Sequence, residues 1–457
     1  MHVGFVGAFA CFSYFSLAPF APSFTDSFFD RQRLMQIGFL SICCVLYLRH
    51  IDVSQSFRLK NNWLTLSAVA FLGLGFVSTL NSDEFLDSLL YVLHVAMLIA
   101  ASVCASRIPE APMRGALYLL LITHSALICY SLLYLVFAVS DGGGLLPQVI
   151  YFGFDNIRFF NQVQIFIMPI LVWMLSCIRF GRLALLMLYA NLLLMFLGGG
   201  LGVLLAWLMV MIGIFCVVSR KLGIHIFLIT VLAWAGYMLL QYIALRFGSN
   251  KVHMLDVSSG GRVELWSTTI AMLDWSSLLV GQGPGLFAGV HGVSRGAIVF
   301  SHPHNVILEL LVEWGGLATL VALGILLFVA RAYYTTNIVS REIRKFRLVD
   351  AIFAAWGGGL AYSFVSGVLV MPVSQTLFFV FTGFLLGLCS ATDTEGDASV
   401  ENGTNNAIVL SKGVSWVIGA LLVAYIIMAI YSLIQIDPLQ PAFQGPRFWL
   451  NGERYLP

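Results

Sequence analysis

The sequence predicts an all-α integral membrane protein, a polytopic bundle of about 12–13 transmembrane helices with a loop and helix cap on one face. Composition indicates the membrane, because 60% of the 457 residues are hydrophobic and only 10% are charged. A soluble domain carries about 25% charged residues, so this chain has too few charges to cover a water-facing surface. Long apolar runs predict the spans. The concentration of basic residues in every second loop predicts their orientation.

The candidate spans are apolar runs of about 17–20 residues, which is the length that crosses roughly 30 Å of hydrocarbon. The first run lacks a basic leader and a small-residue cleavage site, so we expect a retained span rather than a cleaved signal peptide. The second, sixth and seventh runs are short, which leaves the total open by about one or two spans. The runs lie near residues 3–19, 34–48, 63–80, 85–104, 115–139, 163–178, 183–198, 201–218, 222–244, 305–330, 348–370, 373–390 and 413–434.

Basic residues concentrate in alternate loops, and the alternation continues over six successive loops. By the positive-inside rule these loops are cytoplasmic. They hold fifteen of the 24 Lys and Arg residues: Arg49, Arg58, Lys60, Arg107, Arg114, Arg179, Arg182, Arg220, Lys221, Arg331, Arg341, Arg344, Lys345, Arg347 and Lys412.

The chain divides into helical blocks and loops. Two long loops, 140–162 and 245–304, are separated by four spans and therefore emerge on the same outer face. Loops of this length, rich in Gly, Arg, His and Trp, are more often functional than not. The blocks are 1–139 (N-terminal transmembrane helices), 163–244 (central helices), 305–434 (C-terminal helices, with a polar cytoplasmic loop near 391–412) and 435–457 (C-terminal tail).

Glycine, arginine and histidine motifs follow one another in the second outer loop. Apolar residues at 263, 266, 270 and 273 predict a short amphipathic helix that lies on the membrane or caps a cavity. The string Gly281-Gln282-Gly283-Pro284-Gly285 allows backbone conformations closed to other residues and the close approach of a ligand. It lacks the Lys-Ser/Thr of a nucleotide-binding loop.

Ionisable residues also gather where the next span begins. The motif Ser301-His302-Pro303-His304-Asn305 leads into NVILELLVEWGGL, so the sequence predicts Glu309 and Glu313 on the first turns of a membrane helix. Charged groups are costly there, which favours a functional role. The two glutamates are four residues apart and share one helix face, from which both could point into a common cavity.

These motifs together resemble the O-antigen ligase and polymerase superfamily. The resemblance rests on GxGPGxF, on HPHNxxLExxxEWG, on the upstream GGRxxLW, and on RFFN in the earlier outer loop, and it covers about residues 158–164 and 259–316. The remaining spans agree only in number and hydropathy. The superfamily includes lipopolysaccharide O-antigen ligases, O-antigen polymerases and bacterial protein O-oligosaccharyltransferases.

The resemblance implies a metal-independent glycosyltransferase that uses no cofactor. It would move a glycan from an undecaprenyl-pyrophosphate carrier onto a hydroxyl acceptor, at the periplasmic face of the bacterial inner membrane. Its pattern of two outer-face arginines and a histidine maps onto Arg158, Arg262 and His304. Guanidinium groups bind a pyrophosphate bidentately, and histidine can deprotonate the attacking hydroxyl. We expect His304 and Arg262 to be catalytic, and substrate to be bound by Arg158, His302, Asn305, Glu309 and Glu313.

Several alternatives stay open at this point. His302 is a second candidate for the base. Arg158 could instead anchor a helix end at the outer headgroups, and Glu309 and Glu313 could instead join neighbouring helices. The acceptor is lipid A–core in an O-antigen ligase, protein (for instance pilin) in an oligosaccharyltransferase, or growing glycan in a polymerase. A transporter or flippase would share the span count, although transporters place charged residues near the bilayer midplane. The charges lie in short scattered clusters and give no indication of nucleic-acid binding, so no nucleic-acid partner is expected. No histidine, cysteine or carboxylate spacing predicts a metal.

Overall fold

The structure is a computed structural model, and it describes the membrane bundle and part of its cap. The predicted polar loop between 395 and 411, the tail beyond 434 except for two residues, and parts of both long outer loops lie outside the described residues. The described residues are 1–22, 25, 27–50, 62–140, 150–175, 180–246, 261–271, 273–287, 294–295, 298–299, 301–337, 346–394, 412–434 and 448–449.

Helices make up almost all of the described chain. In the first half these are α1 (His2–Leu17), α2 (Phe28–His50), α3 (Asn62–Leu80), α4 (Phe85–Ser106), α5 (Glu110–Ser140), α7 (Ile157–Leu175), α8 (Gly181–Leu197), α9 (Leu201–Gly213) continuing as the π-helical turn η1 (Ile214–Val218), and α10 (Arg220–Arg246). In the second half they are α11 (Arg262–Ala271), α12 (Trp275–Val280), α14 (Val306–Asn337), α15 (Leu348–Ser363), α16 (Pro372–Thr394) and α17 (Lys412–Ile434).

The chain is a polytopic helical membrane protein, as the composition predicts. In the described part, eight helices are long and apolar enough to cross a membrane, and three shorter apolar helices accompany them. Every run that the sequence predicts as a span coincides with a helix. The helices α2 and α15 are not among these eleven. The apolar stretch of α2 contains Arg33 and Gln36, and α15 is 16 residues long and begins with a turn that contains Asp350.

The centre of the bundle is α7, in which every side chain from Phe159 to Met174 is buried. A helix that is apolar on all sides must be surrounded by other helices, and α7 packs against α8 and α15. A second packed pair, α4 with α16, lies beside it, and α2 contacts both members of that pair. Arg158 stands at the head of α7, immediately before this buried stretch.

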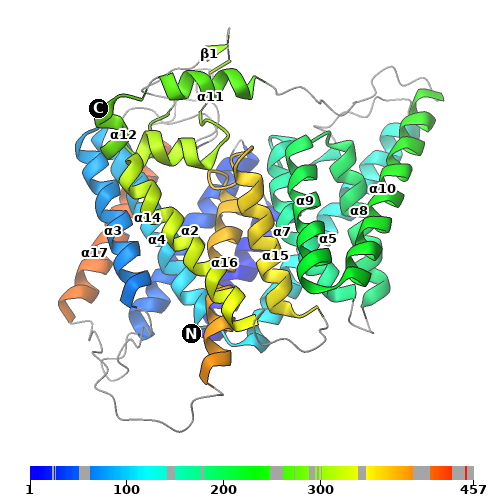
Figure 1. Ribbon diagram of the computed structural model, residues 1–457, viewed down its shortest axis with the longest axis horizontal. Coiled ribbons are helices and arrows are strands. Elements are labelled where there is room, and N and C mark those ends of the chain that lie inside the picture. Colours follow the sequence, from blue (N-terminus) through cyan, green and yellow to red (C-terminus); the bar gives the residue numbers. More distant parts are fainter. Residues whose placement is uncertain are drawn as a thin grey trace.

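A cap covers one end of the bundle, which we call the α11 end. Figure 1 shows α11 lying across the ends of the spanning helices, with α12 at the same end. A small antiparallel hairpin, β1 (Ser294–Arg295) and β2 (Ile298–Val299), belongs to the same stretch of chain. The predicted helix is present as α11. Leu265 and Thr269 are buried, whereas Val263 and Ile270 are exposed.

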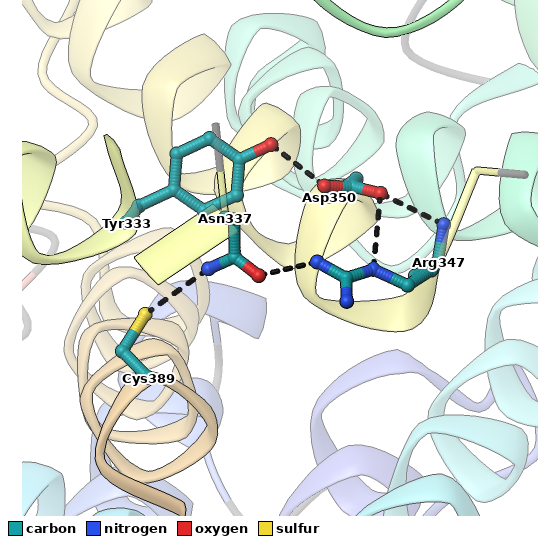
Figure 2. Close-up of polar contacts among 5 residues, drawn as sticks. All are labelled: Tyr333, Asn337, Arg347, Asp350 and Cys389. Atoms are coloured by element: carbon teal, nitrogen blue, oxygen red, sulfur yellow. Dashed lines mark hydrogen bonds and ion pairs between the residues drawn. The ribbon is translucent and has the colours of Figure 1, made fainter. Parts of the chain in front are cut away.

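The helix α14 consists of two helical pieces joined at Gly315, whose φ of 84° and ψ of 167° break the helix. At its far end, α14 is tied to α15 and α16 by the polar contacts drawn in Figure 2. The Tyr333 hydroxyl donates to Asp350 at 2.7 Å, and the Arg347 backbone N–H donates to the same carboxylate at 2.9 Å. Asn337 accepts from the Arg347 guanidinium and contacts the Cys389 sulfur at 3.7 Å. The Asp350 carboxylate thus joins α14 to α15, and Asn337 joins α14 to α16.

Candidate functional site

Three predicted site residues come from distant parts of the sequence and meet at the α11 end. Arg158 is the second residue of α7, Arg262 is the first residue of α11, and His304 lies two residues before α14. The positive charges of both arginines act on the His304 imidazole. Arg158 is exposed, and Arg262 and His304 are half-buried, so the group can be approached from outside the bundle.

Burial, followed by the positive charges of Arg158 and Arg262, lowers the pKa of His304 to about 3. The imidazole is therefore neutral at physiological pH, which is the form that can accept a proton. Among the described residues, His304 is also the one non-glycine residue with a positive φ, at 54°. Such a conformation costs on the order of 1–3 kcal/mol and is concentrated at functional sites.

His302 supports His304 and does not turn away from it. The ring centroids of His302 and His304 are 4.1 Å apart, with their planes at 68°. The backbone N–H of His304 donates to Nδ1 of His302 at 3.3 Å, and His302 is only 3% exposed. The Trp266 indole of α11 donates to the carbonyl of Pro303 at 2.9 Å, which fixes the cap to this motif.

Asn305 begins α14 as its capping residue. Its side-chain oxygen accepts from the backbone N–H groups of Ile307 at 3.0 Å and Leu308 at 3.2 Å. A side-chain oxygen in this position satisfies donors that the first helical turn leaves open. Asn305 therefore acts as a helix cap, and its role in substrate binding stays a prediction.

Glu313 is also occupied by the protein. Its carboxylate, 2% exposed, accepts from the backbone N–H groups of Gly285 at 2.9 Å and Phe287 at 3.2 Å. Glu309, one turn earlier, is half-buried. The two glutamates therefore have different surroundings, and Glu313 holds the glycine loop. The binding of substrate by Glu309 and Glu313 stays a prediction.

The glycine loop, residues 281–287, packs against the break in α14. A helix end leaves carbonyls without partners, and here the N–H groups of Gln282 and Gly283 donate to the carbonyls of Val312 at 2.9 Å and Glu313 at 3.1 Å. A Cβ on Gly281 would lie 2.6 Å from the nitrogen of Gly315, so the two backbones pack directly on each other. Gly281 thus permits the close approach of α14, whereas Gly283 packs against Ser82 and Gly285 against Tyr91. The approach of a ligand to this loop stays a prediction.

We expect Gly315→Ala to destabilise the protein strongly, because the new Cβ would lie 2.5 Å from the carbonyl oxygen of Leu279. The backbone of Gly315, at φ 84° and ψ 167°, lies in a region essentially restricted to glycine, which costs other residues on the order of 1–3 kcal/mol. Gly324→Ala is the matched control, since Gly324 is in the same helix with no atom within 4 Å of its Cβ position. Thermal unfolding of the detergent-solubilised variants measures the difference. Equal melting temperatures would mean that the break at Gly315 is not required.

Sequence reasoning missed the polar residues that surround this group. Gln162, one turn after Arg158, donates to the hydroxyl of Ser366 at 2.9 Å. The charges of Arg158 and Arg262 also act on the hydroxyl of Tyr362. The signal that could have found Gln162 is its spacing of four residues from Arg158, which places both on one helix face.

The arrangement can hold an anion beside a neutral imidazole. Among the described residues, no group of three or more His, Cys, Asp or Glu side chains is placed to hold a metal ion. Comparison with protein families, with curated proteins and with solved structures finds no match to this chain. The class that fold and site define is therefore a polytopic helical membrane protein with an arginine and histidine cluster at one end.

Proposed function

We propose that the protein is a glycosyltransferase of the bacterial inner membrane that transfers a glycan from undecaprenyl pyrophosphate to a hydroxyl acceptor. The observation that carries the proposal is the convergence of Arg158, Arg262 and a neutral His304 at one end of the bundle. A lipid-linked diphosphate carries its charge at the membrane surface, where these arginines meet it. Undecaprenyl remains in the bilayer, beside the helices.

In the proposed reaction the oxygen of the acceptor hydroxyl attacks the anomeric carbon of the glycan, and His304 accepts the proton of that hydroxyl. The bond between that carbon and the phosphate oxygen breaks, and undecaprenyl pyrophosphate leaves with the electron pair. Arg158 and Arg262 stabilise the charge that develops on the leaving phosphate through charge-assisted hydrogen bonds. The donor is already activated, so neither a nucleotide nor a metal is needed.

An O-antigen ligase with a lipid A–core acceptor is our first choice, and a protein O-oligosaccharyltransferase is the alternative, with O-antigen polymerase third. Deletion of the gene, followed by separate gels of lipopolysaccharide and of glycosylated pilin, tests the choice. Loss of the O-antigen ladder from lipid A–core supports ligase, and loss of pilin glycan supports the alternative. Shortened glycan chains on an intact core support polymerase. A strain in which no glycoconjugate changes would contradict the proposal.

We further propose that the α11 end faces the periplasm. A membrane-impermeant maleimide should then label Val263→Cys, on the exposed side of α11, in intact cells. It should label Lys221→Cys, exposed at the start of α10, only after permeabilisation. Both variants are made in a cysteine-free background, because Cys11, Cys129 and Cys216 are exposed. Labelling of the two positions with the reverse pattern would place the arginine and histidine cluster on the cytoplasmic side.

A transporter or flippase is the second candidate, and one observation favours it. Arg33 lies buried inside the bundle within 3.2 Å of His94, and ionisable groups inside a membrane protein often mark a substrate path. Reconstitution in liposomes distinguishes the two functions. Movement of a lipid-linked glycan across the bilayer without any acceptor would support transport, whereas the proposed enzyme requires an acceptor and releases undecaprenyl pyrophosphate.

A further inference from the structure

Arg33 is a buried cation in α2 whose donors are directed to the surrounding helices. It is 1% exposed, and the rings of Phe29 and Phe448 lie 5.4 and 5.1 Å from its guanidinium carbon. Its Nε donates to the carbonyl of Phe448 at 2.8 Å, and its Nη2 donates to the carbonyl of Val370 at 2.7 Å. Its Nη1 donates to Gln375 at 3.0 Å. A buried charge is costly unless its hydrogen bonds are satisfied, so these partners are required.

One of those partners belongs to the α15–α16 loop, residues 364–371. The loop contains little regular structure, and side chains satisfy three of its consecutive carbonyls. These side-chain contacts add to the loop's own backbone bonds, in which the N–H groups of Val370 and Met371 donate to the carbonyl of Gly367 at 3.0 and 3.2 Å. The three contacts are Ser374 Oγ to Val368 at 2.7 Å, Gln375 Nε2 to Leu369 at 2.7 Å, and Arg33 Nη2 to Val370 at 2.7 Å.

The other side of the same loop forms the wall behind His302. A Cβ on Gly367 would lie 2.7 Å from Nε2 of His302, so the imidazole rests on the bare backbone of that glycine. Nδ1 of His302 in turn accepts from the backbone of His304. Ser366, the residue before Gly367, is bonded to Gln162 on the helix that carries Arg158. The loop thus contacts both the histidine pair and the helix of the first arginine.

We propose that Arg33 is a positioning residue for the histidine pair. By holding the α15–α16 loop, it presses Gly367 against His302 and thereby sets the position of His304 relative to Arg158 and Arg262. This inference rests on the proposed function, because it assigns Arg33 a role in the transfer that His304 would perform. It also explains why a charged residue stays inside the bundle.

Arg33→Lys tests the inference. A lysine keeps the charge but has no planar fork, so it cannot reach Val370, Phe448 and Gln375 together. We expect kcat to fall by roughly 10²-fold, because a displacement of about 1 Å can have that effect. The KM for the donor should change little, since neither Arg158 nor Arg262 is altered.

Arg31→Lys is the matched control. Arg31 lies on the same helix, is also 1% exposed, and donates to the carbonyl of Ala21 at 3.1 Å, not to the α15–α16 loop. Loss of a buried guanidinium should therefore affect α2 in both variants, while only Arg33→Lys releases the loop. A kcat in Arg33→Lys within about twofold of that in Arg31→Lys would overturn the inference.

Gly367→Ala changes the contact between the α15–α16 loop and His302 directly, and it leaves Arg33 unchanged. In both Arg33→Lys and Gly367→Ala, diethyl pyrocarbonate should modify His302 faster than in Arg31→Lys, as measured by peptide mass spectrometry. This measurement needs no glycan. Equal reactivity of His302 in the three variants overturns the positioning role alone. A wild-type protein that transfers no glycan from purified undecaprenyl-pyrophosphate donor overturns the proposed function instead.

Discussion

His304→Ala is expected to reduce glycan transfer by about 10²–10⁴-fold, the typical loss when a positioned base is removed. The protein should still fold, because the His304 side chain is half-buried and α14 is capped by Asn305. The assay is transfer in vitro from purified undecaprenyl-pyrophosphate glycan to the acceptor that the deletion strain identifies. Substantial activity in this variant would remove His304 from the role of base.

His302→Ala is the comparison within the same motif, and its expected effect depends on the contact between His302 and His304. Because His302 accepts from the backbone of His304, its loss should lower activity by less than the loss of His304 itself. His302→Asn, whose side-chain oxygen can also accept from that N–H, should recover part of the activity. If His302→Ala is the more damaging of the two alanine variants, the base is His302.

The pH dependence follows from the lowered pKa of His304. A base must be neutral, so activity is kept above its pKa and lost as the pH falls through it. In the free protein that pKa is about 3, so the acid limb of kcat/KM should lie far below neutral pH. A bound diphosphate would offset the charges of Arg158 and Arg262 and raise the pKa. The acid limb of kcat, which reports the complex, should therefore lie at higher pH than that of kcat/KM.

Arg262→Lys should lose most of the activity even though the charge is kept, with a decrease on the order of 10²–10³-fold in kcat. An ammonium group cannot reproduce the two parallel hydrogen bonds that a guanidinium makes to a phosphate. Full activity would reduce Arg262 to a general electrostatic role.

Arg158→Lys provides the comparison within the same site. Arg158 is exposed at the head of α7, whereas Arg262 is half-buried. If Arg158 attracts the donor by charge alone, the lysine should raise KM modestly and leave kcat nearly unchanged. A loss as large as that of Arg262→Lys would mean that both guanidinium groups hold the leaving phosphate.

The spans and their boundaries follow closely from the sequence because hydrocarbon thickness sets a minimum apolar length. Charged side chains blurred this pattern at one position, the start of α2. The apolar run suggested a span from residue 34, but the helix begins at Phe28 and takes Arg31 and Arg33 into the bundle. A hydropathy scale scores each arginine as a loop residue, because it takes no account of the carbonyl groups that accept hydrogen bonds from these side chains.

The convergence of Arg158, Arg262 and His304 was expected from motif resemblance and not from physics, because no local pattern relates residues that far apart. The roles of Asn305 and Glu313 were less accessible still. Each depends on which backbone N–H groups lie nearby, and for Glu313 those groups belong to the glycine loop. From the sequence alone, a carboxylate and a glycine-rich loop indicate a ligand site as readily as they indicate a contact between the two segments.

The helix α14 is bonded to its neighbours at two points. Near Gly315 the glycine loop is bonded to the carbonyls of Val312 and Glu313, and near the far end of the helix Tyr333 is bonded to the buried Asp350. Under the proposed function, α14 would act as a strut that keeps the histidine motif at a constant height. The reactants would then reach this motif by lateral diffusion in the lipid and by approach from the water.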